Sequence, residues 1–320
     1  MLGSTLALEL LTSHGAPDLD PSRCVRTRNR QASCARCIST CPHQAIQSDA
    51  HLLRIDAARC RSCRLCEAAC PTGALRTERS PFDEWLQTLE ARLHPIWGCN
   101  LHSNVEGHVQ SACLGFLSLE YLLVLAALLP KGVTFNLTRC GHCPNSAAPA
   151  ALVEGIERLE LLPDYPYAGR LRLAWTEDAL RYRPEGISRR NFFRKFSRDT
   201  GSTLRQAVRR AVQRGKVAPY GNKRLPAGRE LLLQVLPCLE ESFRPVVRDH
   251  FFPRLTINTS CGTCRGCVGM CPTGALRPDQ NSLSSSPPIF HADKCTACNL
   301  CVDFCRRHAI KLDFALESSR

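Results

Sequence analysis

Residues 95–174 alternate between short apolar runs and longer segments with the apolar spacing of helices. The apolar runs predict four strands, at residues 95–99, 107–113, 133–137 and 170–174. Helical spacing is found at residues 117–129 and 147–162. Strands that alternate with helices are typical of a parallel sheet covered by helices. The pattern therefore predicts a small α/β domain at about residues 94–176.

Two apolar segments near this domain predict buried helices. Residues 81–93 begin with Pro81, which suits a first helical turn, and their apolar side chains recur at helical spacing: Phe82, Trp85, Leu86, Leu89 and Leu93. Residues 112–129 are mostly apolar, but they contain Glu120 and end before Pro130-Lys131. These interruptions favour a core helix over a membrane span.

Residues 177–236 form a basic segment. Between Arg181 and Arg229 there are 15 Lys and Arg residues against Glu185 and Asp199, which matches the net charge of +13 of the whole chain. Amphipathic helices are expected at 188–196 and from 203 to 214. Such helices suit an acidic protein partner or a membrane surface, and equally a linker whose apolar face packs on the protein. Nucleic acid is disfavoured, because no readout module accompanies the charge.

Within this segment, Ser188-Arg189-Arg190 resembles a twin-arginine export motif. It is internal and no apolar region follows it, so export is not expected. The first residues of the chain also lack the basic start of a signal peptide. We therefore expect a cytoplasmic protein whose cysteines, 21 in all, are reduced and mostly hold metal.

The cysteines are concentrated in runs with a repeated spacing. Near the C-terminus, Cys261-Gly-Thr-Cys264-Arg-Gly-Cys267 is followed by Cys271-Pro272, and Cys295-Thr-Ala-Cys298-Asn-Leu-Cys301 is followed by Cys305. These runs resemble the bacterial 2[4Fe–4S] ferredoxins, over about residues 250–315. In such proteins the fourth cysteine of each run binds the other cluster. The resemblance implies two ligand sets: Cys261, Cys264, Cys267 and Cys305, and Cys271, Cys295, Cys298 and Cys301. Zinc is the alternative, but a zinc ion with four ligands has no use for three cysteines at this spacing followed by Cys-Pro.

A second module is predicted at residues 24–75. Its later run resembles the C-terminal ones, and Cys-Pro-Thr-Gly-Ala-Leu is identical at 70–75 and 271–276. Its earlier run has Gln31 where a cysteine is expected, so we expect Cys24 to supply the missing sulfur. The resemblance then implies two further sets: Cys41, Cys60, Cys63 and Cys66, and Cys24, Cys34, Cys37 and Cys70. The alternative is a three-iron cluster or a vacant site.

The last cysteine run departs from the others after its fourth cysteine. Arg306-Arg307-His308 stands where Pro-Thr-Gly occurs elsewhere. Arginine here either changes the hydrogen bonding around the cluster or is a tolerated surface substitution.

Four more cysteines follow predicted strands of the central domain: Cys99, Cys113, Cys140 and Cys143. The arrangement is similar to the iron–sulfur delta subunit found with hydrogenases and heterodisulfide reductases, which implies a [2Fe–2S] site. Structural zinc and unligated core cysteines are the alternatives. His102, His108 and His142 are possible substitute ligands. Cys238 has no expected partner and is interpreted as a buried apolar residue.

Together these patterns predict an α+β protein with two 2[4Fe–4S] ferredoxin-like lobes flanking a small α/β domain. The expected domains are residues 1–93, 94–176, 177–236 and 237–320. No Gly-rich nucleotide loop, flavin fingerprint or pair of catalytic carboxylates is evident. The function expected is therefore transfer of single electrons to or from a larger oxidoreductase or carrier protein with an acidic docking surface. The alternative is a maturation or adaptor protein that binds its client through the basic segment.

Overall fold

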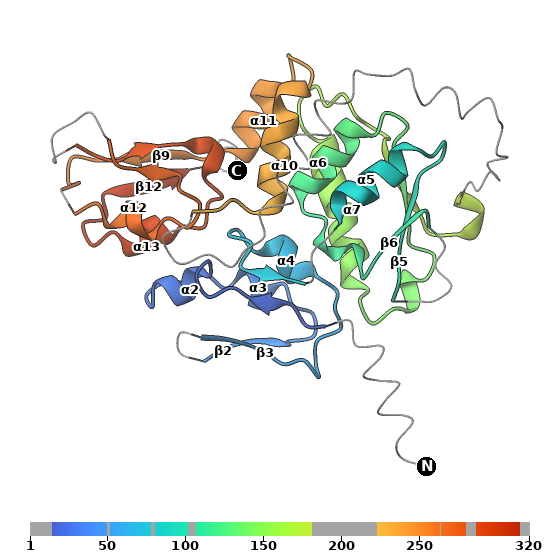
Figure 1. The fold of residues 1–320 in the computed structure, drawn as a ribbon, viewed down its shortest axis with the longest axis horizontal. Helices are drawn as coiled ribbons and strands as arrows, with labels where there is room; N and C mark the ends of the chain where they lie inside the picture. Colours follow the sequence, from blue (N-terminus) through green and yellow to red (C-terminus); the bar gives the residue numbers. More distant parts are fainter. Residues whose placement is uncertain are drawn as a thin grey trace, which may run out of the picture. The chain divides into compact units, whose positions relative to one another are not determined.

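The computed structural model describes residues 15–49, 52–77, 81–101, 107–180, 223–262, 264–279 and 286–313 (Figure 1). The chain divides into two compact units. The first contains Met1–Arg79, Val217–Arg229 and Glu240–Arg320, and the second contains Ser80–Lys216 and Glu230–Leu239. Both cysteine-rich lobes thus belong to one unit. The domain boundaries expected at residues 93, 176 and 236 stay predictions, and the basic helices expected at 188–196 and 203–214 lie outside the described residues.

The N-terminal lobe is held together by two short antiparallel pairs of strands. β1 (Asp18–Leu19) pairs with β4 (Leu75–Arg76), which brings the two ends of the lobe together. β2 (Ile46–Asp49) and β3 (Leu52–Ile55) form a hairpin between the two cysteine runs. The helices of this lobe are short: α2 (Val25–Arg28), α3 (Arg36–Ser39) and α4 (Leu65–Ala69).

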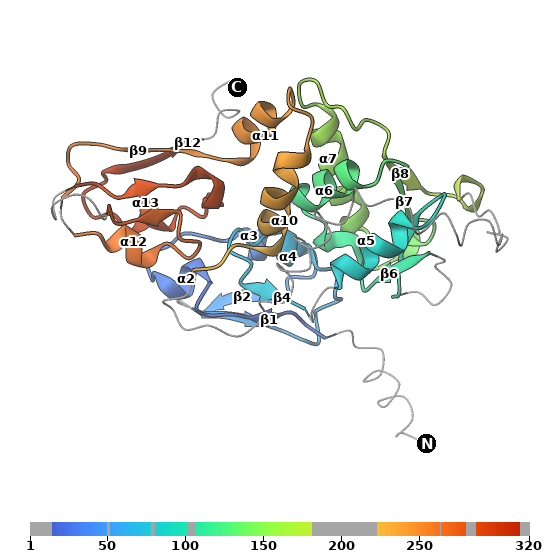
Figure 2. The ribbon, with the colours of Figure 1, turned by 45° about the horizontal axis from the view of Figure 1, so that its top comes forward.

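The C-terminal lobe repeats this arrangement. β9 (Arg254–Ile257) pairs with β12 (Ile310–Asp313) across the ends of the lobe, and β10 (Leu276–Arg277) pairs with β11 (Ile289–Phe290) between the runs. Its helices are α11 (Arg244–Phe251), α12 (Gly266–Met270) and α13 (Leu300–Phe304), with a 3₁₀ turn at Ala292–Lys294. In Figures 1 and 2 these strands and helices are orange to red.

One turn occurs four times in these lobes, and each time it begins at the fourth cysteine of a run. Its fourth residue has a left-handed backbone, with φ between 48° and 73°: Gln44, Gly73, Gly274 and His308. Glycine adopts this conformation without strain, whereas other residues are penalised there. The turn is therefore common to all four runs, although only two of them place glycine at it.

The second unit contains a four-stranded parallel sheet in the order β6-β5-β7-β8. Its strands are β5 (Ile96–Cys99), β6 (Val109–Ser111), β7 (Val133–Asn136) and β8 (Leu171–Ala174), each within a segment where the sequence predicted a strand. α6 (Leu119–Leu128) joins β6 to β7 and α7 (Ala147–Glu160) joins β7 to β8. Three 3₁₀ turns lie at Leu114–Phe116, Cys140–His142 and Glu177–Ala179.

Aromatic side chains fill the core beside this sheet. Trp97 in β5 is fully buried, and the rings of Trp85 and Phe116 lie 5.3 and 6.0 Å from it, between centroids. Phe82 and Trp85 belong to α5 (Phe82–Glu90), so the helix predicted before this domain packs on the domain's own core. Leu93, in contrast, lies beyond the helix and is 48% exposed.

The middle of α6 is fully buried. Its residues from Leu122 to Ala126 are inaccessible to solvent, which explains why the segment is apolar on every side. Across the described part of the chain, no helix has the length and apolar character needed to span a bilayer.

The interpretation of Cys238 as a buried residue is wrong. Cys238 ends a 3₁₀ turn (Leu236–Cys238) that follows α10 (Ala227–Val235), and it is exposed. In a 3₁₀ turn, residues three positions apart share a face. Leu236 and Leu239 therefore both point inward, at 5% and 2% exposure, and the thiol between them points out.

Candidate metal centres

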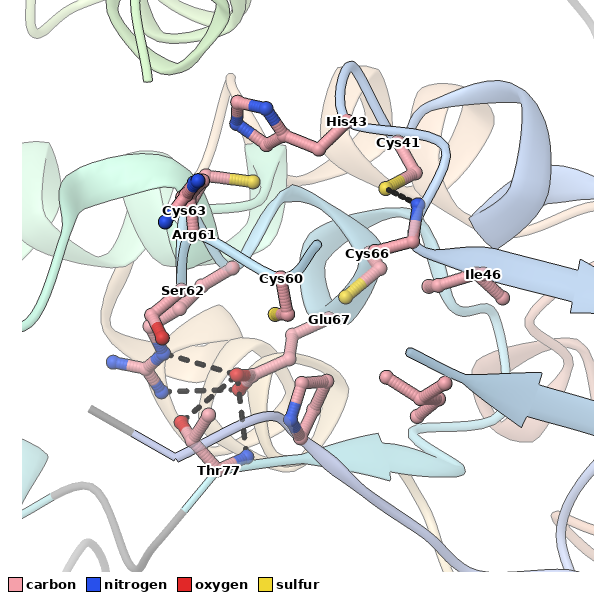
Figure 3. A pocket seen from close by; sticks show the side chains of 14 residues that line it. Cys41, His43, Ile46, Cys60, Arg61, Ser62, Cys63, Cys66, Glu67 and Thr77 are labelled. Carbon is pink, nitrogen blue, oxygen red and sulfur yellow. Dashed lines mark hydrogen bonds and ion pairs between the residues drawn. The ribbon is translucent and has the colours of Figure 1, made fainter. Parts of the chain in front are cut away.

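The first candidate centre lies in the N-terminal lobe. A hollow of about 400 Å³ is lined by four cysteines from both runs of this lobe: Cys41, Cys60, Cys63 and Cys66. Figure 3 shows their sulfur atoms around this hollow, with Ile46 on one wall. Cys41 follows α3, whereas the other three precede or begin α4. Folding thus unites the ligand set that the resemblance implied.

A buried ion pair fixes the loop of this centre. The Arg64 guanidinium donates two hydrogen bonds of 3.0 Å to the Glu67 carboxylate, and the two side chains are 6% and 12% exposed. Glu67 also accepts hydrogen bonds from the backbone N–H and the hydroxyl of Thr77 (Figure 3). Because the pair is bidentate and further bonded, its charges are compensated inside the protein.

The second centre of this lobe contains Cys24. Burial, followed by the neighbouring Cys70, Cys34 and Cys24, raises the pKa of the Cys37 thiol to about 12. Burial also raises the pKa of Cys34, and Cys70 and Cys24 contribute. Cys24 itself is 6% exposed. The structure therefore brings Cys24 close to the other three thiols, although Gln31 occupies the position where the regular spacing has a cysteine.

The third centre is in the C-terminal lobe. Cys271 lines a hollow of about 330 Å³ together with Cys295, Cys298 and Cys301. Burial raises the pKa of Cys295 to about 11 and that of Cys298 to about 12, and other thiols of the set add to both shifts. Cys271 differs from them. Burial would raise its pKa, but hydrogen bonds from the Thr273 hydroxyl and from backbone N–H groups outweigh burial and lower it.

The fourth centre lies in the same lobe. Burial, with Cys261 and Cys264 as neighbours, raises the pKa of Cys267 to about 11. Cys305 packs against the buried cluster of apolar residues that contains Cys267. Cys264 is exposed, so this centre lies nearer to solvent than the set around Cys298.

Each recurring turn directs a backbone donor at a cysteine sulfur. The N–H of Ala45 points to Cys41 at 3.3 Å, that of Ala74 to Cys70 at 3.2 Å, and that of Ala309 to Cys305 at 3.4 Å. The N–H of Ala275 is likewise bonded to Cys271. Such donors stabilise negative charge on a ligating sulfur. The bond at Cys305 is kept although Arg306 replaces proline.

A fifth group of cysteines lies in the second unit. Cys99 ends β5, Cys113 follows β6, and Cys140 and Cys143 follow β7, so all four stand at the carboxyl ends of parallel strands. They line one hollow of about 410 Å³. Burial, and then Cys99 and Cys143, raise the pKa of Cys140 to about 12. The N–H of Asn145 donates to the Cys143 sulfur at 3.4 Å.

Neither of the two described histidines that were expected as substitute ligands, His108 and His142, lines this hollow. His108 accepts a hydrogen bond from the N–H of Ile96 through Nδ1, at 3.0 Å, and His142 lies in the 3₁₀ turn between the last two cysteines. His102 lies outside the described residues. Throughout the described ranges, no three His, Cys, Asp or Glu side chains are arranged to hold a single metal ion.

Sequence reasoning missed one residue beside the third centre. Arg229 was counted with the basic segment, yet it is 5% exposed. Its guanidinium donates to the carbonyls of Cys295 at 2.6 Å, Phe251 at 2.9 Å and Asp293 at 3.3 Å. The ring of Phe252 lies 5.0 Å below it. The sequence offered one signal for the burial of Arg229, which is that an apolar run begins two residues later, at Leu231.

The donor sets fit iron–sulfur clusters. Thiolates gathered in fours, with backbone N–H groups aimed at them, are the environment that [4Fe–4S] clusters require. A family model described as "4Fe-4S dicluster domain" matches residues 23–74. Another, described as "4Fe-4S binding domain", matches residues 288–311. No curated protein and no solved structure gave a significant match to the chain. The chain is thus an iron–sulfur protein that binds [4Fe–4S] clusters, with ferredoxin-type domains towards both ends.

Proposed function

We propose that this chain is a relay for single electrons, built as a polyferredoxin. The observation that supports it best is that both lobes belong to one compact unit, which gathers sixteen cysteines in four sets of four. Such sets would hold four [4Fe–4S] clusters, each of which takes up and releases one electron. A protein that used a cluster only for storage or for structural support would not need four clusters in one compact unit.

The proposed ligand assignment follows the cysteines that the fold brings together. The four sets are Cys24, Cys34, Cys37 and Cys70; Cys41, Cys60, Cys63 and Cys66; Cys271, Cys295, Cys298 and Cys301; and Cys261, Cys264, Cys267 and Cys305. Loading these sites requires the thiols to lose protons, and the raised pKa values show that burial alone opposes this loss. The backbone N–H groups of the four turns act in the opposite direction.

The second unit is proposed to hold a further iron–sulfur group on Cys99, Cys113, Cys140 and Cys143. An iron–sulfur group suits these thiols, because four cysteines line one hollow and each can supply one sulfur ligand. A [2Fe–2S] cluster is the form that the delta-subunit resemblance favours, and zinc is the competing occupant. A cluster at this site would then be a further electron carrier of the relay.

The partner proposed is a larger oxidoreductase or a carrier protein with an acidic docking surface. The support comes from the sequence, in which 15 basic residues lie between Arg181 and Arg229. Complementary charge speeds the encounter of proteins that exchange electrons. We place the protein in the cytoplasm, where its thiols would stay reduced before cluster insertion.

The experiment is a redox titration of the full chain purified without oxygen. A relay takes up about four electrons or more per chain, returns them on reoxidation, and passes them to a viologen dye. The result that contradicts the proposal is an iron-loaded protein that cannot be reduced and reoxidised reversibly. If such a protein also bound an iron-free client equally well in either redox state, the adaptor function would replace the relay.

A further inference from the structure

The stretch from Cys24 to Cys34 is the part of the N-terminal lobe that departs most from the repeat. In the three regular runs, two residues separate the first two cysteines, as in Cys295-Thr-Ala-Cys298. Here nine residues separate them, and the first four form α2. The extra residues are not a free loop, because the Arg26 guanidinium donates to the Cys34 carbonyl at 3.0 Å and closes the stretch on itself.

This stretch packs its apolar side chains on the C-terminal lobe. Val25 and Ala32 form a buried cluster with Leu300, at 2%, 5% and 0% exposure. Leu300 begins α13 and stands between Cys298 and Cys301 in the sequence. Cys34 and Cys298 pack against the same cluster. A thiol from each lobe therefore borders one shared apolar contact.

The same stretch places a cation at the end of α12. Arg28 donates from Nε to the Met270 carbonyl and from Nη2 to the Gly269 carbonyl, both at 3.0 Å. Lys223 donates to the Gly269 carbonyl as well, at 2.6 Å. Carbonyls at the end of a helix lack partners within the helix and attract cations. Met270 directly precedes Cys271, so the two cations meet beside a ligand of the third centre. In Figures 1 and 2, α2 and α12 lie side by side.

A further arginine connects the cysteine loops themselves. Arg36 stands between Cys34 and Cys37 in sequence and donates from Nη2 to the Ala297 carbonyl at 2.9 Å. Ala297 precedes Cys298. The N–H of Ser33 lies 3.4 Å from the Asp303 carboxylate in the same region. Each of these contacts joins the Cys24 set in one lobe to the Cys271 set in the other.

We propose that residues 24–36 form an interlobe clamp, which holds the Cys24 set against the Cys271 set so that electrons cross between the lobes there. The clamp rests on the proposed relay function and specifies its path. The Cys24 and Cys271 sets are the inner sites, and the Cys41 and Cys261 sets are the outer ones. Electron tunnelling falls steeply with distance, so the crossing is made at the inner pair. The displaced first cysteine is thereby explained, because a two-residue spacing leaves no room for α2.

The test removes the two clamp arginines from the full chain. The Arg28→Gln/Arg36→Gln variant is compared with Arg54→Gln/Arg59→Gln, which removes equal charge from the same lobe where the partners are Asp49 and Asp56. Amide hydrogen exchange at residues 266–271 and 296–301 reports the clamp without any redox step. Low-temperature EPR of the reduced protein reports magnetic coupling between the inner sites.

The clamp predicts exchange about tenfold faster at both segments in the clamp variant, with weakened coupling between the inner sites, because several charge-assisted hydrogen bonds are lost. The control variant stays within about twofold of the native protein, the scatter expected of surface ion pairs. If the clamp variant loses iron, the experiment is repeated with the single Arg36→Gln variant, because the Arg36 side chain is exposed. Exchange and coupling equal to the native protein at full iron content would overturn the clamp. A native protein that fails to pass electrons, with the exchange result as predicted, would instead overturn the relay and leave the clamp as an interlobe contact.

Discussion

The two lobes of the first unit have the same plan but reach it with different loops. In the regular runs the residue after the second cysteine has a left-handed backbone, as at Arg64, Arg265 and Asn299. At the corresponding position of the displaced run, Ala35 has a φ of −126°. The thiols nevertheless gather in fours in both lobes. The sulfur positions are therefore retained in both lobes, whereas the loop that carries them can differ. In the N-terminal lobe, this loop has acquired a second role as the proposed interlobe clamp.

Buried arginines also distinguish the lobes. Arg64 in the N-terminal lobe is neutralised by Glu67 at 3.0 Å. Arg229 beside the C-terminal lobe donates to backbone carbonyls, including that of Cys295. A cation close to a cluster favours its reduced state, whereas a neutralised pair has little net effect. We therefore expect the Cys271 set to be easier to reduce than the Cys41 set.

The largest effect is expected from removing the displaced ligand. Cys24→Ala leaves the second centre with three thiols, so iron should fall by one to four atoms of about 16, and oxidised samples should show the EPR signal of a three-iron cluster. Iron and EPR analysis of the variant checks this. Cys238→Ala is the matched control, because its thiol is exposed and outside every set. Equal iron in both variants would mean that Cys24 is not a ligand.

Removing the buried arginine should have the next largest effect. Arg229→Met leaves three carbonyls without their donor, and the expected loss in the free energy of unfolding is about 2–4 kcal/mol. Denaturant unfolding followed by cluster absorbance measures it. Arg254→Gln serves as the control in the same lobe, since its ion pair with Asp249 is exposed and should contribute less than about 1 kcal/mol. Equal losses in the free energy of unfolding for the two variants would show that the buried hydrogen bonds of Arg229 contribute no more than a surface ion pair.

The recurring turn offers a smaller and symmetric effect. Gly73 and Gly274 have φ values of +60° and +73°, so an alanine at either should cost about 1–2 kcal/mol. An added Cβ would also approach Pro226 at Gly73 and Lys223 at Gly274. Denaturant unfolding should therefore show a similar loss in the free energy of unfolding for the two variants. The reverse change, His308→Gly, should not destabilise the protein, and a clear loss there would show that the four turns are not equivalent.

The smallest effect concerns pH and the iron-free chain. Burial raises the pKa of Cys37 and Cys298 to about 12, above the value of about 9 for an unfolded thiol. These thiols favour the folded state fully below pH 9, and this contribution is lost as the pH rises towards 12. The unfolding temperature of the iron-free chain should therefore fall between pH 8 and pH 10, whereas the loaded protein, whose thiols are already deprotonated, should change less. Parallel curves for the two forms would contradict this assignment of charge.

The sequence, through its ferredoxin resemblance, predicted which cysteines gather around one hollow, as Cys41, Cys60, Cys63 and Cys66 do, whereas their role as cluster ligands stays a prediction. It also predicted the strands that end near Cys99 and Cys113, since apolar runs at sheet strands are a local signal. It could not predict that Arg28 reaches Met270, 242 residues away, or that Arg229 is buried. Such contacts depend on how distant segments pack, and arginines in a basic segment look alike in sequence. Cys238 was misjudged for the same reason, because one residue of rotation in a 3₁₀ turn decides its face.

The central claim is that both lobes complete two four-thiolate sites, with Cys24 serving in place of a cysteine at position 31. Iron and acid-labile sulfide counts, with EPR on the full chain purified without oxygen, test it most directly. The account predicts about 16 iron atoms from the four sets, about 18 if the second unit holds a two-iron group, and no three-iron signal in the native protein. About 12 iron atoms, a native three-iron signal, or a colourless protein would contradict it.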